Sequence, residues 1–475
     1  MRQALSVASE CVPLVKTGGL ADVVGALPAA LKPEGWALRT LLPGYPMVLR
    51  ALGKTKPVWA TKDLFGGAAQ LLAANVAGLD LLILDAPHLY DRDGSIYLAP
   101  NGQDYPDNPE RFAALSWVAA HIATKGVAGW TPEVLHLHDW QSALTPWYLR
   151  EMGGTAGTLL TIHNVAFHGI APAARLNALR LPPDGFNSDG FEYWGQINML
   201  KAGIVAADKI STVSPTYARE LTTPEFGMGL EGVLAARQGD LSGVLNGIDT
   251  EVWNPETDTA IKTHFKTGRG KAKSKAQLEQ EFDLPAADGP LCVVVSRLTA
   301  QKGLDLLLEA LPALVDRGGR LALLGSGDRE LENAWLRASD AHPFVSVRIG
   351  YDEDLSHRMF AGADAVLVPS RFEPCGLTQL YGLRYGAVPV VALTGGLADT
   401  VIPANTAALK AGVATGLQFH PITTDAMAHS LIQLCQLFAD KPAWTRLQSN
   451  AMKHPVGWET SAHAYAEIYD GLNRQ

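Results

Sequence analysis

The chain of 475 residues has few cysteines and no long apolar segment. Its four cysteines lie far apart in the sequence, and none belongs to a CxxC pair. This spacing argues against a zinc site or a disulfide framework and predicts a reducing, cytoplasmic compartment. No run of 18 apolar residues occurs, so we expect no transmembrane helix and no membrane partner. The opening segment, MRQALSVASE, is too short and too polar to predict a signal peptide.

Positive charge is also scarce. The 39 Lys and Arg residues are outnumbered by 48 Asp and Glu residues, which gives a net charge of −9. This balance gives no indication of nonspecific binding to nucleic acid. If the substrate is an anion, the cations that bind it must be gathered locally by the fold.

Two common phosphate-binding loops are missing. The chain has no Walker loop and no GxGxxG string, which argues against a P-loop nucleotidase and against an NAD-linked oxidoreductase. It has instead the hexapeptide TGGLAD twice, at 17–22 and at 394–399. Each copy follows an apolar run and precedes a helical pattern. The repeat predicts two similar strand–loop–helix units, with a ligand bound between two halves of the chain.

Short apolar runs alternate with helical patterns in both halves, which indicates two parallel α/β sheets. A chain of this length is expected to form two or three domains, and we place the boundaries at 1–244 and 245–455. A final amphipathic helix is predicted within 456–475. The predicted strands are 4–9, 38–43, 79–87, 134–139, 157–164 and 209–214, followed by 290–298, 319–327, 344–350, 364–370, 388–396 and 414–419.

The segment 245–280 differs from both halves, because it is basic, polar and interrupted by glycines. We interpret it as a solvated, partly mobile connection. The alternative is a patch that binds phosphate or nucleic acid, which is disfavoured because no aromatic residues interleave with its lysines.

Polar residues follow several of the predicted strands, where ligands bind in open α/β sheets. Lys16 precedes Gly18 and Gly19, whose backbone N–H groups are expected to approach an anion; the alternative is a tight turn with a solvated lysine. Arg297 and Lys302 flank a loop before a helix. They are predicted to neutralise a diphosphate leaving group, as a metal ion otherwise does, unless they are ordinary surface charges.

Glu373 follows another strand end, and its carboxylate is suited to sugar hydroxyls. The backbone amides after it, over 375–378, are suited to phosphate or hydroxyl groups. A nucleophilic Cys375 is the weaker alternative, because no histidine is paired with it in the sequence. The second TGGLAD copy follows Leu393 instead of a lysine, so we expect it to shape the site and to offer backbone amides.

Histidines and acidic residues give less specific signals. His163 could serve as a ligand, a base or a hydrogen-bond donor, although ordinary packing is the simpler interpretation. We expect His136 and His138 to point to opposite faces of their strand, so that they cannot bind one metal together. The DxD string at 91–93 lies in a polar turn, and a solvated turn is favoured over a metal site.

A set of longer motifs then occurs in a fixed order. It includes KTGGLADVVGALP, HDWQ, TIHN, VSPTYA, LNGID, SRLT, LGSGD, SRFEPCGLTQLYGLRYG and TGGLADTV. The chain resembles the bacterial glycogen synthases along nearly its whole length, except for 255–290 and the last residues. KTGGLAD together with FEPCGLTQLYGLRYG is shared mainly with starch synthases.

This resemblance implies a retaining transferase that moves glucose from ADP-glucose to the 4-OH of an α-1,4-glucan, without a metal or other cofactor. It implies an α/β fold of the GT-B type, with two Rossmann-like, doubly wound domains facing across a deep cleft. The C-terminal helix is expected to pack on the N-terminal domain. Two alternatives stay open: a catalytically dead sugar-nucleotide or glucan-binding protein, and a related transferase with another donor.

The resemblance also assigns roles to residues. Lys16, Gly18 and Gly19 are expected to contact the diphosphate and glucose, Arg297 and Lys302 the diphosphate, Asp22 the ribose and Tyr351 the adenine. The glucose is assigned to Glu373, His163, Asn246, Cys375, Gly376, Leu377 and Thr378. Asp139 is expected near the reacting centre, and Asn164 follows His163 in the same loop.

One position departs from a wider pattern. Many related retaining transferases carry a second glutamate eight residues after the first, and here that position is Tyr381. The change argues against the sucrose and trehalose branches and fits the glycogen and starch branch.

Overall fold

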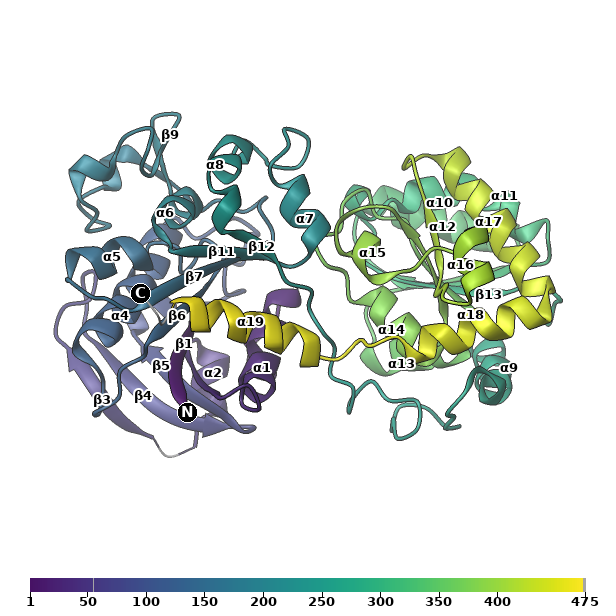
Figure 1. Cartoon of the computed structure of the whole chain (residues 1–475), viewed down its shortest axis with the longest axis horizontal. Helices are drawn as coiled ribbons and strands as arrows, with labels where there is room; N and C mark the ends of the chain where they lie inside the picture. Colours follow the sequence, from purple (N-terminus) through teal and green to yellow (C-terminus); the bar gives the residue numbers. More distant parts are fainter. Residues whose placement is uncertain (54, 473–475) are drawn as a thin grey trace. The chain divides into compact units, whose positions relative to one another are not determined.

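The computed structural model describes residues 1–53 and 55–472. It divides into two compact units, one of Met1–Leu245 with Trp458–Gln475 and one of Asn246–Gly457. Each unit has its own sheet and its own layers of helices (Figure 1). Within the described part of the chain, no helix combines the length and apolar character needed to span a bilayer.

The N-terminal unit is built on a nine-stranded sheet in the order β12-β11-β7-β6-β1-β2-β5-β4-β3. All six strands predicted for this half are confirmed. The sequence missed three strands: β12, a three-residue strand at one edge, and β3 and β4, which pair antiparallel at the other edge. None of the three is fully buried, so they lack the continuous apolar run of a central parallel strand. The bounds are β1 Arg2–Val7, β2 Trp36–Pro43, β3 Lys56–Thr61, β4 Ala69–Val76, β5 Leu79–Asp85, β6 Val134–His138, β7 Gly157–Ile162, β11 Lys209–Thr212 and β12 Leu241–Gly243.

Helices and a small sheet complete this unit. The helices are α1 Gly19–Leu31, α2 Pro46–Ala51, α3 Pro87–Tyr90, α4 Asn108–Lys125, α5 Thr145–Glu151, α6 Met199–Ala206, α7 Pro215–Glu220 and α8 Glu231–Ala236. The second sheet is antiparallel, with β8 Ile170–Pro172, β9 Glu192–Tyr193 and β10 Gln196–Asn198 in the order β8-β10-β9.

The last helix, α19 (Glu459–Leu472), belongs to the N-terminal unit and packs on α1 and β7 (Figure 1). Its buried tyrosines anchor it: the ring of Tyr469 meets that of Trp36 edge to face at 5.1 Å, and its hydroxyl lies 2.7 Å from Nδ1 of His136. The positions 473–475 of the predicted helix lie outside the described residues.

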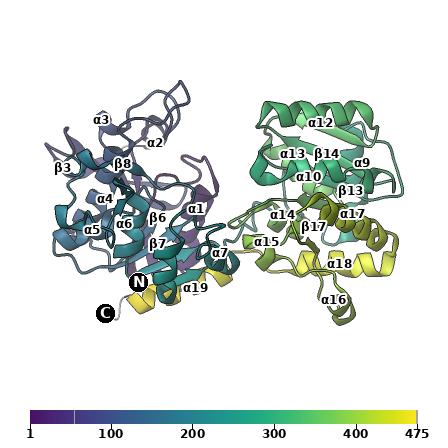
Figure 2. The ribbon, with the colours of Figure 1, turned by 90° about the horizontal axis from the view of Figure 1, so that it is seen from above.

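The C-terminal unit has a six-stranded sheet in the order β15-β14-β13-β16-β17-β18, with every pair parallel. Figure 2 shows β13, β14 and β17 of this sheet together with the helices of the unit. All six predicted strands are confirmed, and apolar clusters cover both faces of the sheet. The strands are β13 Leu291–Val295, β14 Arg320–Gly325, β15 Val345–Ile349, β16 Ala365–Val368, β17 Val388–Ala392 and β18 Leu417–Phe419. The helices are α9 Ala272–Glu281, α10 Leu304–Ala310, α11 Pro312–Val315, α12 Arg329–Ala341, α13 Glu353–Gly362, α14 Thr378–Tyr385, α15 Gly395–Thr400, α16 Thr406–Ala411, α17 Thr424–Ala439 and α18 Lys441–Lys453.

The interpretation of 245–280 as a solvated connection is wrong. Its widely spaced apolar residues, Trp253, Ile261 and Phe265, are buried in a core cluster of the C-terminal unit. Lys271 is buried as well, and its ammonium group donates to the carbonyl oxygens of Phe360 and Tyr385, while burial lowers its pKa to about 7. The abundance of lysines obscured the few apolar anchors that decide where the segment lies.

Candidate active site

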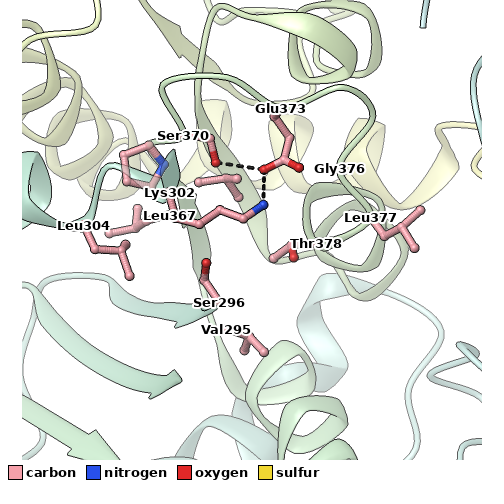
Figure 3. Close-up of a pocket in the computed structure, with 12 residues that line it drawn as sticks. Val295, Ser296, Lys302, Leu304, Leu367, Ser370, Glu373, Gly376, Leu377 and Thr378 are labelled. Atoms are coloured by element: carbon pink, nitrogen blue, oxygen red, sulfur yellow. Dashed lines mark hydrogen bonds and ion pairs between the residues drawn. The ribbon is translucent and has the colours of Figure 1, made fainter. Parts of the chain in front are cut away.

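A small pocket of the C-terminal unit lies where β13 and β16 end (Figure 3). Two loops supply its polar groups: the loop after β13 carries Lys302, and the loop after β16 carries Ser370 and Glu373. The lining residues are Val295, Ser296, Lys302, Leu304, Leu367, Val368, Pro369, Ser370, Glu373, Gly376, Leu377 and Thr378.

Lys302 and Glu373 form an ion pair inside this pocket. Nζ of Lys302 lies 2.5 Å from Oε2 of Glu373, and the Ser370 hydroxyl donates to the same oxygen at 2.9 Å (Figure 3). The two side chains are only 17% and 10% exposed, so their charges interact with weak solvent screening. Among the described residues Oε1 of Glu373 accepts no hydrogen bond, which leaves an acceptor for a ligand hydroxyl.

The second TGGLAD copy supports the Glu373 loop from behind. The amide of Gly396 donates to the carbonyl oxygens of Glu373 and Pro374, at 3.0 and 3.1 Å. A Cβ atom on Gly395 would overlap the carbonyl oxygen of Glu373, and one on Gly396 that of Cys375. The expectation that this copy offers free amides is therefore wrong for Gly396, whose amide is used within the protein.

Cys375 is not placed as a nucleophile. Burial raises the pKa of its thiol to about 12, against a smaller lowering effect from hydrogen bonds with Asn246. Asn246 is itself buried, and its Oδ1 has no hydrogen-bond partner among the described residues. That amide oxygen is a second unused acceptor at the Glu373 loop.

Of three other predicted residues of this unit, one lines the pocket and two do not. Thr378 begins α14, whose N-terminus faces the pocket through Gly376, Leu377 and Thr378. Arg297 follows β13, but its side chain is exposed, does not line the pocket and has no ion pair among the described residues. Tyr351 follows β15 and is 75% exposed, without a ring contact in the described part of the chain.

In the N-terminal unit, the first TGGLAD copy follows β1 and begins α1. Lys16 pairs with Asp22 at 2.8 Å, and burial raises the pKa of Asp22, against the lowering effect of Lys16. A Cβ atom on Gly18 or Gly19 would meet nothing within 4 Å, and φ at Gly18 is −153°, an ordinary extended value. The fold of this unit does not require glycine here, in contrast to the second copy.

Sequence reasoning missed Glu10, a buried carboxylate beside this loop. Its Oε2 accepts hydrogen bonds from the amides of Thr17 and Gly18, and its Oε1 accepts from the hydroxyls of Thr17 and Tyr97, each at 2.6 Å. The amide of Gly18, which was predicted to face an anion, thus faces one that the protein supplies. The only sequence signal was the position of Glu10, just after the first strand.

Asp139 and His163 lie together at the ends of β6 and β7. Oδ1 of Asp139 accepts from the backbone amide of His163 at 2.7 Å, and Asp139 has a left-handed φ of 55°. Burial raises the pKa of Asp139 to about 7, partly offset by hydrogen bonds from the amides of His163 and Asn164. Burial lowers the pKa of His163 to about 3, so its ring is neutral at physiological pH.

The prediction for His136 and His138 is wrong. Residues two apart on a strand share a face, and these two rings lie 4.1 Å apart, centroid to centroid. Nδ1 of His138 lies 3.0 Å from Nε2 of His163, and Nε2 of His136 lies 2.6 Å from the hydroxyl of Thr161. His138 is thus a further residue in contact with the predicted site residue His163.

The DxD turn agrees with its solvated interpretation, since Asp91 and Asp93 are exposed and Arg92 pairs with Asp107.

The starch synthase catalytic domain family matches residues 3–236, and the glycosyl transferases group 1 family matches residues 289–436. A glycogen synthase of Paracoccus denitrificans is 62% identical over 473 residues, covering 99% of this chain and all of that protein. The chain belongs to the glycogen synthase family. A glycogen synthase of a Jannaschia species is 58% identical, and both chains are covered completely.

Solved structures agree with this assignment. The catalytic domain of starch synthase IV from Arabidopsis thaliana, bound to ADP and acarbose, matches with a TM-score of 0.88 at 29% identity, covering both chains completely. A sucrose-phosphate synthase from Thermosynechococcus elongatus matches with a TM-score of 0.60 at 19% identity, covering 99% of each chain, which shows the fold alone. This member of the glycogen synthase family is therefore a glycosyltransferase with two Rossmann-like α/β units of the GT-B class.

The position that departs from other retaining transferases has a distinct environment in this glycogen synthase family member. The ring of Tyr381 stacks on that of Trp253, with the ring centroids 3.7 Å apart. The ring of His357 also stacks on Trp253, at the same centroid distance. Trp253 comes from the segment first interpreted as a connection. An aromatic stack therefore occupies the place of the second glutamate.

Proposed function

We propose that this glycosyltransferase moves glucose from ADP-glucose to the 4-OH at the non-reducing end of an α-1,4-glucan, with retention of the anomeric configuration. One observation carries the proposal: a largely buried lysine and a buried glutamate meet at the ends of two parallel strands, in a pocket where one carboxylate oxygen of the glutamate is an unused acceptor. A cation suits a diphosphate, and a carboxylate suits sugar hydroxyls. The likeness to a starch synthase bound to ADP supports the choice of nucleotide.

The proposed donor contacts in the C-terminal unit begin with Lys302. It pairs with Glu373 in this structure, and on donor binding its ammonium group turns to the diphosphate. Arg297, whose guanidinium has no ion pair among the described residues, adds a second cation. Tyr351 offers an exposed ring for adenine. Two cations next to the departing phosphate supply the charge stabilisation for which other transferases use a metal, so we propose that no metal is needed.

The glucosyl group is assigned to the loop after β16. Glu373, released from Lys302, accepts hydrogen bonds from the ring hydroxyls. The free Oδ1 of Asn246 accepts another, and the backbone of Cys375, Gly376, Leu377 and Thr378 provides the remaining polar contacts.

The N-terminal unit supplies the remaining proposed contacts. Lys16 and the open glycines Gly18 and Gly19 approach the diphosphate and glucose, and Asp22 takes the ribose. His163 orients the glucose 6-OH, and Asn164 lies beside it in the same loop. Asp139 acts near the reacting carbon, where a carboxylate stabilises developing positive charge.

The proposed reaction is a same-face displacement. The acceptor O4 forms a bond to C1 of glucose while the bond from C1 to the β-phosphate oxygen breaks, and the acceptor proton passes to that phosphate oxygen. ADP leaves with its negative charge stabilised by Lys302 and Arg297. No side chain needs to form a covalent intermediate, which agrees with the high thiol pKa of Cys375.

The test is to incubate the protein with ADP-glucose and glycogen and to measure ADP release and chain elongation. Elongation with ADP release supports the proposal. Binding of both ligands without ADP release would favour the catalytically dead alternative, and faster turnover of UDP-glucose would favour another donor. The cytoplasmic location expected from the cysteines stays a prediction.

A further inference from the structure

The hairpin between β9 and β10 carries the most exposed large apolar side chain among the described residues. Tyr193 pairs with Gln196 across the hairpin, so the loop has two residues, Trp194 and Gly195. Both have positive φ, 50° and 77°, which defines a type I′ turn. Trp194 is 86% exposed. Strand β9 lies at the outer edge of the N-terminal unit, beyond α6 (Figure 1).

A tryptophan is an unfavourable choice for this position. Type I′ turns prefer Asn-Gly, because asparagine tolerates the left-handed conformation and bulky residues do not. The exposed indole buries almost none of its surface, so packing does not compensate for the backbone conformation. Strain that the fold does not require is found mostly at functional sites. Contacts within the protein therefore do not account for a tryptophan at position 194, which points to a contact with a ligand.

Neighbouring contacts hold the hairpin in place. The amide of Gly195 donates to Oε1 of Glu192 at 2.6 Å. The ring of Tyr193 lies 5.7 Å from that of His168, edge to face, and a Cβ atom on Gly229 would overlap its hydroxyl. The ring of Trp194 lies 6.5 Å from that of Tyr193, at 80°. The indole thus projects from a braced turn, which lowers the entropy lost when a ligand stacks on it.

The hairpin is continuous with the loop that carries His163. The amides of Met199 and Leu200, which follow β10, donate to the carbonyl oxygens of Gly169 and His168. Phe167, in the same loop, is 61% exposed. A second exposed aromatic side chain therefore lies in the loop between the hairpin's contacts and the predicted site.

We propose that Trp194 forms an accessory binding site for an α-1,4-glucan chain of the acceptor. The face of a glucose unit that carries its axial C–H bonds is apolar and stacks on an indole ring, while the hydroxyls around its rim bond to polar groups. Two such groups, Glu192 and the exposed Gln196, lie within two positions of Trp194 in the hairpin. A stable protein partner would need roughly 1,200 Å² of interface, far more than one indole offers, so the glucan is the better occupant.

The site rests on the proposed function, because it needs a polymeric acceptor. Glycogen presents many chains at once. Holding one chain at Trp194 raises the effective concentration of the other chain ends near the catalytic groups, which increases apparent affinity without a new catalytic contact. A short maltooligosaccharide gains no such advantage.

The experiment compares Trp194→Ala, Trp194→Asn and Trp194→Phe with the wild type, using ADP-glucose with either glycogen or maltotetraose. We expect KM for glycogen to rise about 5-fold or more in the Ala and Asn variants and less in the Phe variant. The kcat with maltotetraose and the KM for ADP-glucose should stay unchanged. Val413→Ala, at a 47% exposed apolar residue of the C-terminal unit, is the matched control and should behave as the wild type.

The Asn variant separates a binding role from a structural one. It places the preferred residue in the turn, so we expect Tm to rise by about 1–3 °C while glycogen affinity falls. Affinity electrophoresis in glycogen-containing gels measures binding without turnover. Wild-type glycogen affinity in all three variants, or a change of oligomeric state on size exclusion, would overturn the site. Absence of ADP release by the wild type with either acceptor would instead overturn the proposed function.

Discussion

Nδ1 of His138 lies 3.0 Å from Nε2 of His163, so the ring proposed to orient the sugar is itself held by a second ring. Burial lowers the pKa of both histidines, so both are neutral. One nitrogen of the pair must then donate and the other accept, which couples the tautomer of His163 to that of His138. The hydroxyl of Ser6, 3.1 Å from Nε2 of His138, ends this chain of hydrogen bonds.

We predict that His138 is a positioning residue. His138→Leu should lower kcat about 10-fold with little change in KM for ADP-glucose, because a charge-free bond that orients His163 is worth about 1 kcal/mol or slightly more. His138→Gln keeps an amide that can bond to Nε2 and should recover part of the activity. Steady-state kinetics and the ¹⁵N signals of the His163 ring measure both effects. Equal losses in the two variants would assign His138 a packing role instead.

Lys302 is predicted to act on the leaving group. Lys302→Ala should lower kcat by about 10²- to 10³-fold, because it removes a preorganised cation at the departing phosphate. Lys266→Ala, at an exposed lysine paired with Glu256, is the control and should leave kcat unchanged. Single-turnover ADP release measures the chemical step directly. Near-wild-type kcat in Lys302→Ala would remove this residue from the proposed mechanism.

The pH dependence should report Asp139. Its pKa is raised to about 7, so the carboxyl is ionised above pH 7 and protonated below it. If the carboxylate stabilises positive charge on the sugar, kcat/KM rises with pH through about 7, and Asp139→Asn removes this limb together with most of the activity.

The same shift affects stability in the opposite direction. A carboxyl with a raised pKa binds its proton more tightly in the folded state, so its contribution to stability is full below the unfolded value of 3.8 and is lost as pH rises through 7. The Tm of Asp139→Asn relative to that of the wild type should therefore increase from pH 5 to pH 8. A Tm difference that does not vary with pH would contradict the assigned titration.

The two TGGLAD copies should respond differently to the same substitution. Gly18→Ala places a methyl group in open space at an ordinary φ, so Tm should be unchanged while KM for ADP-glucose rises. Gly395→Ala, at the equivalent position of the second copy, places it against the carbonyl oxygen of Glu373 at a left-handed φ of 44° and should cost about 2–4 kcal/mol of stability. Thermal unfolding and KM measured on both variants test the contrast. Wild-type donor affinity in a folded Gly18→Ala variant would exclude this loop from donor binding.

The strands show where sequence reasoning succeeds. Strands buried on both faces of a parallel sheet must be apolar throughout, and this requirement can be read from a few neighbouring residues. Each of the six apolar runs predicted between 290 and 419 is therefore a strand of the C-terminal sheet. The antiparallel strands β3 and β4 were missed because most of their residues are exposed or only partly buried. The loops after the strands were located equally well, and with them Lys302, Glu373, Asp139 and His163.

Contacts between segments far apart in the chain could not be predicted from the sequence. Glu10 and Tyr97 meet through a hydrogen bond that spans 87 positions of the chain, and no spacing rule links them. Trp253 and Tyr381 stack across an even longer separation, which hid the role of a segment with a solvated composition. Charge and polarity average over a segment, whereas burial is decided by a few side chains.

The amino-acid sequence alone determined the alternation of strands and helices, the loops that carry the polar residues and, through the order of its motifs, the family. Only the tertiary structure decided what each loop meets. Two identical hexapeptides have opposite surroundings: the glycines of one face open space, and those of the other are enclosed by the Glu373 loop. The physical reason is that propensity and patterning act over a few residues, while packing, hydrogen bonding and pKa depend on neighbours that the fold brings from far along the chain.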